Sequence, residues 1–277
     1  MPPPARPRIL YVTDLAYPAR GRRYGDEDVQ LASRLREYAD LALCHPRDAA
    51  ALMDGFDAVV VRNSGPVLHY RAAYDDFRAR ALAQGVRVYN ELTGRADMAG
   101  KQYLVELSAA GSPVIPTVDR PEDLDRLPAA EAYVVKPKLG ADSIGMRTVP
   151  RDALPGLAGP DVLVQPHVDF RHEVSFVFVD QDFQYALYAP DPARRWVLEP
   201  YDPAPGDLEF ARRFIEWNTV RHGIQRVDAC RTHDGDLLLV ELEDLNPYLS
   251  LDRLPEEVRD RFTAAFTASL RGYLATT

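Results

Sequence analysis

Cysteine is nearly absent from this sequence, and its scarcity excludes two kinds of protein. The 277 residues contain only Cys44 and Cys230, which lie far apart in apolar surroundings. Such a pair provides neither a disulfide framework nor the closely spaced thiolates of a zinc site. The chain is therefore not a small disulfide scaffold, and we expect a soluble protein of the reducing cytoplasm.

Long apolar runs and an excess of basic residues are also missing. No uninterrupted apolar segment approaches the roughly 20 residues that a membrane-spanning helix needs. Basic residues number 33 and acidic residues 42, so the formal net charge is −9. Because a broad anion-binding surface would need the opposite balance, we expect neither a nucleic-acid nor a membrane partner.

Several common nucleotide and hydrolase motifs are absent. The sequence has no Gly-x-Gly-x-x-Gly, no Walker lysine and no nucleophile elbow, and no internal repeat. A simple dinucleotide site, a P-loop and a serine hydrolase are therefore not supported.

The first 90 residues do contain an alternation of apolar strands and helices, which predicts a small doubly wound βαβ domain. The expected strands cover residues 8–13, 41–44, 58–62 and 86–89, and the expected helices begin near residues 26 and 70.

Polar residues at the ends of these strands are candidates for binding a small polar substrate, because ligands of such sheets lie beyond the carboxyl ends of the strands. With one arginine from the Gly/Arg-rich loop, these residues are Asp14, Arg23, Arg62, Asn63 and Ser64. The alternative is that Arg62 and Asn63 only cap a loop.

The middle of the chain combines lysines with a loop of small residues. A connector helix is expected over about 97–110 and carries Lys101. A strand then ends at Lys136-Pro137, and the loop after it contains the residues Lys138, Gly140, Ser143 and Gly145. A strand lysine beside many backbone N–H groups suits phosphate oxygens, although an ordinary hairpin can show the same pattern.

The next strand breaks at Gln165-Pro166-His167-Val168. This break frees backbone polar groups that can contact the edge of a purine. Glu173 begins the following hairpin, where one polar group can face a ribose.

A final hairpin carries an unusual set of acids. Asp228 lies on its first strand, and Glu241 and Glu243 lie two residues apart on the second, so they share a face. Carboxylates gathered in this way repel one another unless a cation lies between them, and Mg²⁺ prefers such oxygen ligands. The alternative is an exposed acidic strand face.

Taken in order, these segments resemble the ATP-grasp superfamily of carboxylate ligases, and the resemblance covers nearly the whole chain. Its elements are Lys101 before Gly111-Ser-Pro-Val-Ile-Pro-Thr117, Val134-Val-Lys136-Pro137, Gln165-Pro-His-Val168, Glu173, and the Asp228…Glu241-x-Glu243 hairpin. Within the superfamily the sequence is most similar to the short, glutathione-synthetase-like ligases that include the D-cycloserine-forming enzyme.

The resemblance implies an α/β (α+β) ATP-grasp fold, with a doubly wound N-terminal domain and two α+β subdomains that clamp ATP. The expected boundaries are 1–90, 91–160 and 161–277. The implied cofactors are ATP and Mg²⁺, with two ions expected and Mn²⁺ as an alternative. The residues implied for ATP are Lys101, Lys136, Lys138, Ser143, Gly145, Gln165, His167, Val168 and Glu173, and those implied for the metal are Asp228, Glu241, Glu243 and Asn246.

The sequence departs from the family pattern at three places. Gly100 precedes the connector lysine where an aspartate is common, and Tyr188-Ala-Pro stands where a lysine is often found. The phosphate role of that lysine passes to Arg195, so Arg195 and Lys136 are the expected catalytic cations. The third departure is the end of the metal strand, Glu243-Asp-Leu-Asn246-Pro247, so either Glu243 or Asn246 provides the last metal oxygen.

The activity implied by the resemblance is ligation of a small carboxylate, activated by ATP as an acyl phosphate, to an amine. The expected partners are small amino-acid-like substrates, and a homodimer is compatible with the sequence. Two alternatives stay open: an ATP-grasp cyclase or ester-forming ligase, and a non-catalytic nucleotide-binding regulatory protein on the same fold.

Overall fold

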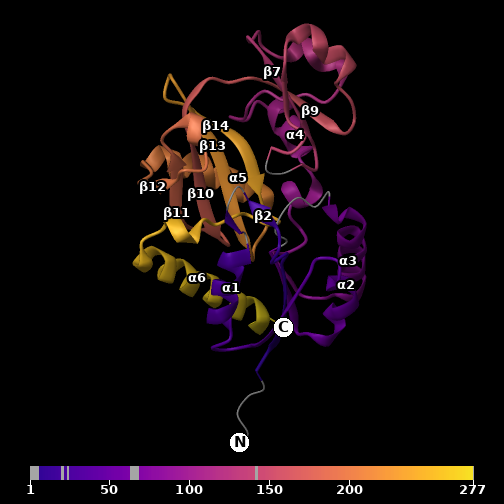
Figure 1. The fold of residues 1–277 in the computed structure, drawn as a ribbon, viewed down its shortest axis with the longest axis vertical. Coiled ribbons are helices and arrows are strands. Elements are labelled where there is room, and N and C mark those ends of the chain that lie inside the picture. The colour runs from indigo at the N-terminus through magenta and orange to yellow at the C-terminus, as the bar shows by residue number, and fades with distance from the viewer. Residues whose placement is uncertain (1–5, 20–21, 24, 63–68, 141–142, 277) are drawn as a thin grey trace, which may run out of the picture.

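The computed structural model describes residues 6–19, 22–23, 25–62, 69–140 and 143–276. Its N-terminal part is built on a parallel sheet with the strand order β4-β1-β5-β6 (Figure 1). The elements of this part are β1 (Arg8–Val12), β2 (Pro18–Ala19), β3 (Arg22–Arg23), α1 (Gly25–Leu35), β4 (Asp40–Cys44), α2 (Ala49–Leu52), η1 (Met53–Gly55), β5 (Ala58–Val61), α3 (Arg71–Gln84) and β6 (Val88–Tyr89).

Both faces of the parallel sheet are covered, which explains why its strands are apolar throughout. Ile9 and Tyr11 of β1 pack in one core with α1 and the C-terminal helix, whereas Leu10 and Val12 pack in another with α2 and α3. Successive strand residues point to opposite faces, so a strand covered on both sides has no polar face. The predicted doubly wound α/β arrangement is confirmed.

The connector differs from the single helix expected over 97–110. It consists of a 3-10 turn, η3 (Asp97–Ala99), and a short helix, α4 (Tyr103–Ala109). Gly100 separates the two with a φ of +89°, a conformation that ends a right-handed helix. The expectation of one continuous helix was wrong, and Lys101 lies just before α4 instead of within a helix.

A small antiparallel sheet with the order β8-β7-β9 follows the connector. Its elements are η4 (Pro121–Arg126), β7 (Tyr133–Pro137), β8 (Arg147–Val149), η5 (Arg151–Gly156) and β9 (Val162–Pro166). Because β9 pairs with β7, this sheet runs across residue 160, where the sequence suggested a boundary. The boundaries at 90 and 160 stay predictions.

The C-terminal part is a five-stranded antiparallel sheet with the order β12-β11-β10-β13-β14. Its elements are β10 (Phe170–Val179), β11 (Asp182–Ala189), η6 (Pro192–Arg194), β12 (Glu199–Tyr201), α5 (Pro205–Asn218), β13 (Ile224–Thr232), β14 (Leu237–Glu243), η7 (Leu251–Arg253) and α6 (Glu256–Ala275). α5 ends at Asn218, because Thr219 adopts a left-handed conformation with φ +66°.

The two helices of this part cover different regions of the sheet. Phe176 and Val227 pack against α5 on one face, and Val177 and Val179 pack against α6 on the other. α6 lies across the lower end of the sheet in Figure 1.

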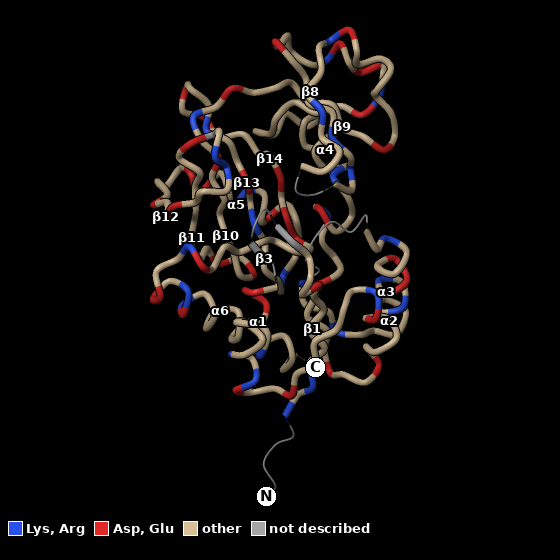
Figure 2. Tube along the Cα trace, viewed as in Figure 1, with Lys and Arg blue, Asp and Glu red and all other residues tan. Residues whose placement is uncertain are grey.

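Charged residues of both signs are interspersed along the whole chain (Figure 2). Among the described residues, no helix is both long enough and apolar enough to cross a membrane.

Candidate functional site

The candidate site lies on the face of the C-terminal sheet opposite α5, beyond the part that packs with α6. On β10, Val174 and Phe176 pack with α5, whereas Glu173 and Ser175 line a cavity of about 160 Å³ on the opposite face. The alternation of a strand thus separates an apolar face that holds the fold from a polar face that is available for chemistry.

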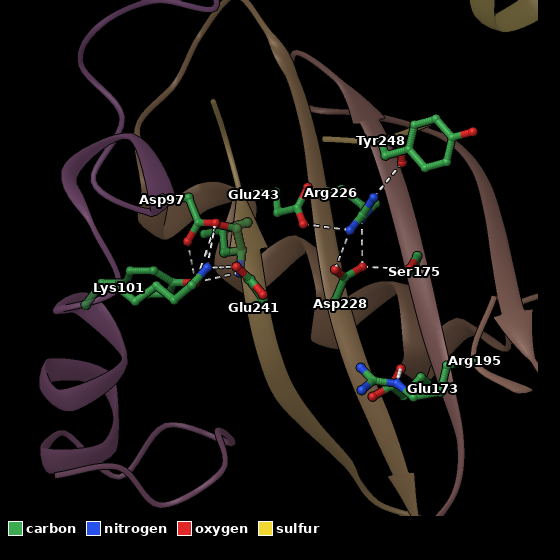
Figure 3. A network of polar contacts seen from close by, with 12 residues as sticks. Asp97, Lys101, Glu173, Ser175, Arg195, Arg226, Asp228, Glu241, Glu243 and Tyr248 are labelled. Carbon is green, nitrogen blue, oxygen red and sulfur yellow. Dashed lines mark hydrogen bonds and ion pairs between the residues drawn. The ribbon is translucent and has the colours of Figure 1, made fainter. Parts of the chain in front are cut away.

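The register of the last hairpin gathers four charged side chains in this cavity. Asp228 lies directly opposite Glu241, and Arg226 lies opposite Glu243. Because residues two apart on a strand share a face, all four project to the same side (Figure 3). The acids that the sequence singled out are therefore brought together as expected.

The cation between these acids is a side chain of the protein. Arg226 Nε and Nη2 donate to Asp228 Oδ1 and Oδ2 at 2.9 and 2.8 Å, and Nη2 also donates to Glu243 Oε1 at 2.7 Å. Ser175 Oγ donates to Asp228 Oδ1 at 2.6 Å. Burial raises the pKa of the Glu243 carboxyl to about 8, and the Arg226 guanidinium opposes that shift.

Arg226 was not among the residues chosen from the sequence, although the signal was present. Its position two residues before Asp228 on a strand already implied a shared face. The sequence reasoning counted only the acids of the hairpin.

A second protein cation neutralises Glu241. Lys101 is 4% exposed, and its Nζ forms ion pairs with Asp97 Oδ2 at 3.0 Å and with Glu241 Oε1. Asp97 was also missed, but its spacing of four residues from Lys101 is one at which opposite charges often pair. Lys101 of the connector thus contacts Glu241, one of the carboxylates expected to bind the metal (Figure 3).

As these side chains stand, the acids do not form a metal cluster. Within the described part of the chain, no group of three or more His, Cys, Asp or Glu residues is arranged to hold a metal ion. Arg226 and Lys101 occupy the carboxylate oxygens that a cation would need. Asn246 lines the same cavity at the end of the hairpin.

The two other lysines lie at the end of β7 and differ in their surroundings. Burial lowers the pKa of the Lys136 ammonium to about 7, and the charge of Lys101 acts in the same direction. Lys138 Nζ forms an ion pair with Asp119 Oδ2 at 2.8 Å. Burial alone would raise the pKa of Asp119, but the hydrogen bonds from Lys138 and Gln102, together with the nearby positive charges, outweigh it and lower that pKa. Ser143 and Gly145 both have a positive φ, and Ser143 lines the cavity.

The residues expected around the nucleoside are only partly gathered. Glu173 lines the cavity, and its Oε2 accepts a hydrogen bond from Arg195 Nε at 2.7 Å. Burial raises the pKa of Glu173, whereas Arg195 opposes the shift. Gln165 is buried and donates to Thr117 Oγ1 at 2.8 Å. His167 and Val168 follow β9 and lie outside the lining of this cavity.

The proposed substrate residues of the N-terminal sheet lie elsewhere. Arg62 is 4% exposed and donates to Glu27 Oε1 at 2.9 Å and Asp28 Oδ1 at 3.0 Å. Asp14 pairs with His45 at 3.5 Å. Asn63, Ser64 and the side chain of Arg23 lie outside the described residues.

Glu27 connects the N-terminal sheet to the segment that follows the acidic hairpin. Its Oε1 also accepts a hydrogen bond from Leu249 N at 2.9 Å. Burial raises the pKa of Glu27 to about 8, which the Arg62 charge opposes and the Asp28 charge reinforces. The sequence did not single out Glu27 and Asp28, so their pairing with the buried Arg62 was missed.

Comparison with known proteins identifies the fold. No protein-family model matches the chain, and no curated protein matches it. Solved structures do match, and the matches include proteins described as ATP-grasp ligases, so the predicted ATP-grasp fold is confirmed.

Three of these structures illustrate the similarity. D-cycloserine synthetase DcsG has a TM-score of 0.72 and 23% identity, with 95% of this chain and 99% of that chain covered. The ATP-grasp ligase PsnB, in complex with a variant of its minimal precursor, Mg and ADP, has a TM-score of 0.65, 18% identity and coverage of 94% and 96%. D-alanine–D-alanine ligase from Bacillus anthracis has a TM-score of 0.63, 13% identity and coverage of 97% and 96%.

Proposed function

We propose that this protein is an ATP-dependent ligase that activates a small-molecule carboxylate as an acyl phosphate and joins it to an amine. The proposal rests on one observation: a single cavity of an ATP-grasp fold is lined by Asp228, Glu241, Glu243 and Arg226, and the buried Lys101 pairs with Glu241. Similarity to proteins named as ligases supports the reaction class.

The donor set of the cavity suits Mg²⁺. Asp97, Glu173, Asp228, Glu241 and Glu243 provide five carboxylates, while Lys101, Arg195 and Arg226 provide three cations, which leaves two negative charges. Hard oxygen ligands with this residual charge match a divalent cation. When bound, Mg²⁺ would supply neutralisation of the β- and γ-phosphate charge.

We assign the metal to Asp228, Glu241 and one further oxygen donor. That donor is either Glu243, which Arg226 holds at 2.7 Å, or Asn246, which lines the same cavity.

ATP would occupy the rest of the cavity. Lys101 and Lys136 would hold its phosphates, and the Gly140–Gly145 loop would cover them, which excludes water from the reactive acyl phosphate. Glu173 would face the ribose, and the purine would extend beyond the lining of this cavity to contact residues 165–168. Arg195 is assigned to the phosphates in place of the missing lysine, and Lys138 would first have to leave Asp119.

The reaction then has two steps. A carboxylate oxygen of the substrate takes the γ-phosphoryl group and ADP leaves. The amine nitrogen next attacks the acyl carbon, the bond from that carbon to the phosphate oxygen breaks, and inorganic phosphate and a proton from the amine leave. We assign Arg226, beside the acids that hold the metal, to stabilise the negative charge that develops on the acyl oxygen.

The test is substrate-dependent release of ADP across pairs of amino acids and amines. Glu241→Gln and Lys136→Met should each lower the rate by about a hundredfold or more. Glu199→Gln, on the exposed strand β12, is the matched control and should keep the rate. Full activity in both cavity variants would refute the proposal. ATP binding without turnover on any pair would favour the regulatory alternative, and product analysis separates amide formation from cyclisation or ester formation.

A further inference from the structure

A second, smaller cavity lies between α3 and the connector. Its volume is about 70 Å³, and Arg71, Tyr74 and Arg78 of α3 line it from one side. Lys101 and Lys138 line it from the other side. Asp97 and Asn246 line both this cavity and the larger one, so the two are neighbours. We call the smaller cavity the α3 pocket.

Two polar groups of α3 lack a partner at this pocket. Tyr74 is 4% exposed, and its buried hydroxyl forms no hydrogen bond with any residue that the structure describes. The Nε of Arg78 is likewise buried without a partner. A buried donor without a partner costs about 1–3 kcal/mol, so native proteins rarely leave such groups unsatisfied. Their presence in the lining of one cavity indicates that a ligand supplies the acceptor.

The electrostatics of Tyr74 agree with this geometry. Burial raises the pKa of its hydroxyl, the charge of Arg78 opposes that shift most strongly, and the charges of Asp244 and Asp75 add to it. Arg71 already pairs with Asp75 at 2.7 Å, which leaves Arg78 as the arginine with open donors.

The charge of the lining selects the ligand. Of the four basic side chains in the lining, Arg71 pairs with Asp75, Lys101 with Asp97 and Glu241, and Lys138 with Asp119. Among the described residues, Arg78 is therefore the one cation of the lining that has no carboxylate partner. Lysine occurs at only three positions of the sequence, and two of them are in this lining. A guanidinium and a phenol hydroxyl are donors that match the oxygens of a carboxylate or a phosphate.

We propose that the α3 pocket is an anion-binding subsite, in which Tyr74 and Arg78 hold a carboxylate or phosphate group of the molecule that is ligated. This inference rests on the proposed ligase function, because that function places the reacting carboxylate in the neighbouring cavity. It deepens the function by naming the substrate class: a molecule with a second anionic group besides the carboxylate that is activated.

The experiment measures binding of inorganic phosphate to the full-length protein by ³¹P NMR and calorimetry, in the presence of saturating magnesium and AMPPNP. The nucleotide analogue fills the larger cavity, so phosphate that still binds must use another site. Arg78→Met and Tyr74→Phe should each weaken phosphate binding about tenfold, since each removes a buried donor. Arg80→Met is the matched control, because Arg80 lies on the same helix and pairs with Asp54 at 3.6 Å, outside the pocket.

The outcomes are distinct. Unchanged phosphate affinity in both Arg78→Met and Tyr74→Phe, with circular dichroism showing folded protein, overturns the proposal. Loss of phosphate binding in wild-type protein on addition of the nucleotide analogue also overturns it, because the ion then occupied the nucleotide site. Displacement of phosphate by acetate supports a substrate carboxylate, and resistance to acetate supports a substrate phosphate. Retained phosphate binding in a protein that releases no ADP on any substrate pair would support the subsite and refute only the ligase function.

Discussion

Arg226 and Asp228 form a bidentate pair, in which Nε and Nη2 of the guanidinium donate to the two carboxylate oxygens at 2.9 and 2.8 Å. The same Nη2 reaches Glu243 at 2.7 Å, so one guanidinium serves two carboxylates. The side chains of Arg226 and Asp228 are 16% and 19% exposed. At this degree of burial the pair is shielded from most of the screening that weakens surface ion pairs.

This pairing predicts a specific pattern of stability. Arg226→Met should lower the free energy of unfolding by about 2–3 kcal/mol, because it leaves two partly buried carboxylates without their cation. Adding Glu243→Gln should recover about half of the loss, since only one carboxylate then lacks a partner. Urea denaturation of the wild-type, single and double variants checks the prediction. If Arg226→Met is as stable as the wild type, or if the second substitution destabilises further, the guanidinium does not balance these acids.

The sequence was sufficient for the elements whose signals are local. Two such signals can be recognised without tertiary information. One is the apolar runs of a sheet that is covered on both faces, and the other is the fixed spacing of Asp228, Glu241 and Glu243 on a hairpin. The order of Lys101, Lys136 and these acids along the chain then indicated the fold. Each of these signals depends on residue type and spacing within one segment.

The contacts that could not be predicted join segments far apart in the chain. Arg62 was expected to contact the substrate from the end of a strand. It is buried instead, and it donates hydrogen bonds to two acids about 35 positions earlier in the chain. The division of the connector depends on the left-handed conformation of Gly100, which glycine permits but does not require. The α3 pocket needs residues from α3, the connector and the end of β7, so no single stretch reveals it.

The lowered pKa of Lys136 predicts that nucleotide binding is coupled to proton uptake. Its pKa is lowered from the usual lysine value of 10.5 to about 7, so at pH 8 the free protein holds it mostly neutral. Phosphate oxygens favour the ammonium form, and binding should therefore take up close to one proton at pH 8 and much less at pH 6. Calorimetry of magnesium–AMPPNP binding in buffers of different ionisation enthalpy measures this number.

The control for this prediction is within the same segment. Lys136→Met should abolish the proton uptake, whereas Lys138→Met should retain it because Lys138 is paired with Asp119. Binding heats at pH 8 that do not depend on the buffer would contradict the assignment. The lowered pKa also affects stability in the absence of nucleotide. Between about pH 7 and 10.5 the unfolded chain binds more protons at Lys136 than the folded protein does, so the contribution of Lys136 to stability rises with pH in this range.

The raised pKa of Glu27 predicts that its contribution to stability falls as the pH rises, which is opposite to the contribution of Lys136. The pKa of Glu27 is raised from 4.5 to about 8, so between these values the folded protein binds more protons than the unfolded chain. The contribution of Glu27 to stability is therefore full below pH 4.5 and is lost as the pH rises toward 8, with a slope of at most about 1.4 kcal/mol per pH unit. Glu27→Gln removes this slope while it keeps an oxygen for Arg62 and Leu249.

The measurement compares urea denaturation at pH 5.5 and 8 for the wild type, Glu27→Gln and a surface control. Glu37→Gln is that control, because Glu37 is 72% exposed on a neighbouring turn. Relative to wild type, Glu27→Gln should become more favourable as the pH rises, and Glu37→Gln should not. A stability difference for Glu27→Gln that is independent of pH would show that Glu27 is ionised in the folded protein throughout this range.

The crowded surroundings of Gly94 provide a test of whether the turn that carries Asp97 must stay in place for Lys101 to be positioned. A Cβ at residue 94 would lie 2.2 Å from Asp244 Oδ2 and 2.8 Å from Met98 Sδ. Asp244 is completely buried and accepts hydrogen bonds from Ala96 N at 3.1 Å and Met98 N at 2.8 Å, which fix the turn that carries Asp97. Gly94→Ala must displace this carboxylate, so it should cost about 1–3 kcal/mol of stability and weaken magnesium–AMPPNP binding about tenfold.

The matched control is Gly55→Ala, since a Cβ at residue 55 meets no atom within 4 Å. That variant should stay within about 0.5 kcal/mol of the wild type and bind the nucleotide normally. Thermal denaturation and calorimetry on the two variants separate a general effect of alanine from displacement of the turn. If Gly94→Ala loses stability but keeps its nucleotide affinity, the turn can shift without moving Lys101, and the proposed phosphate contact of Lys101 does not depend on Asp244.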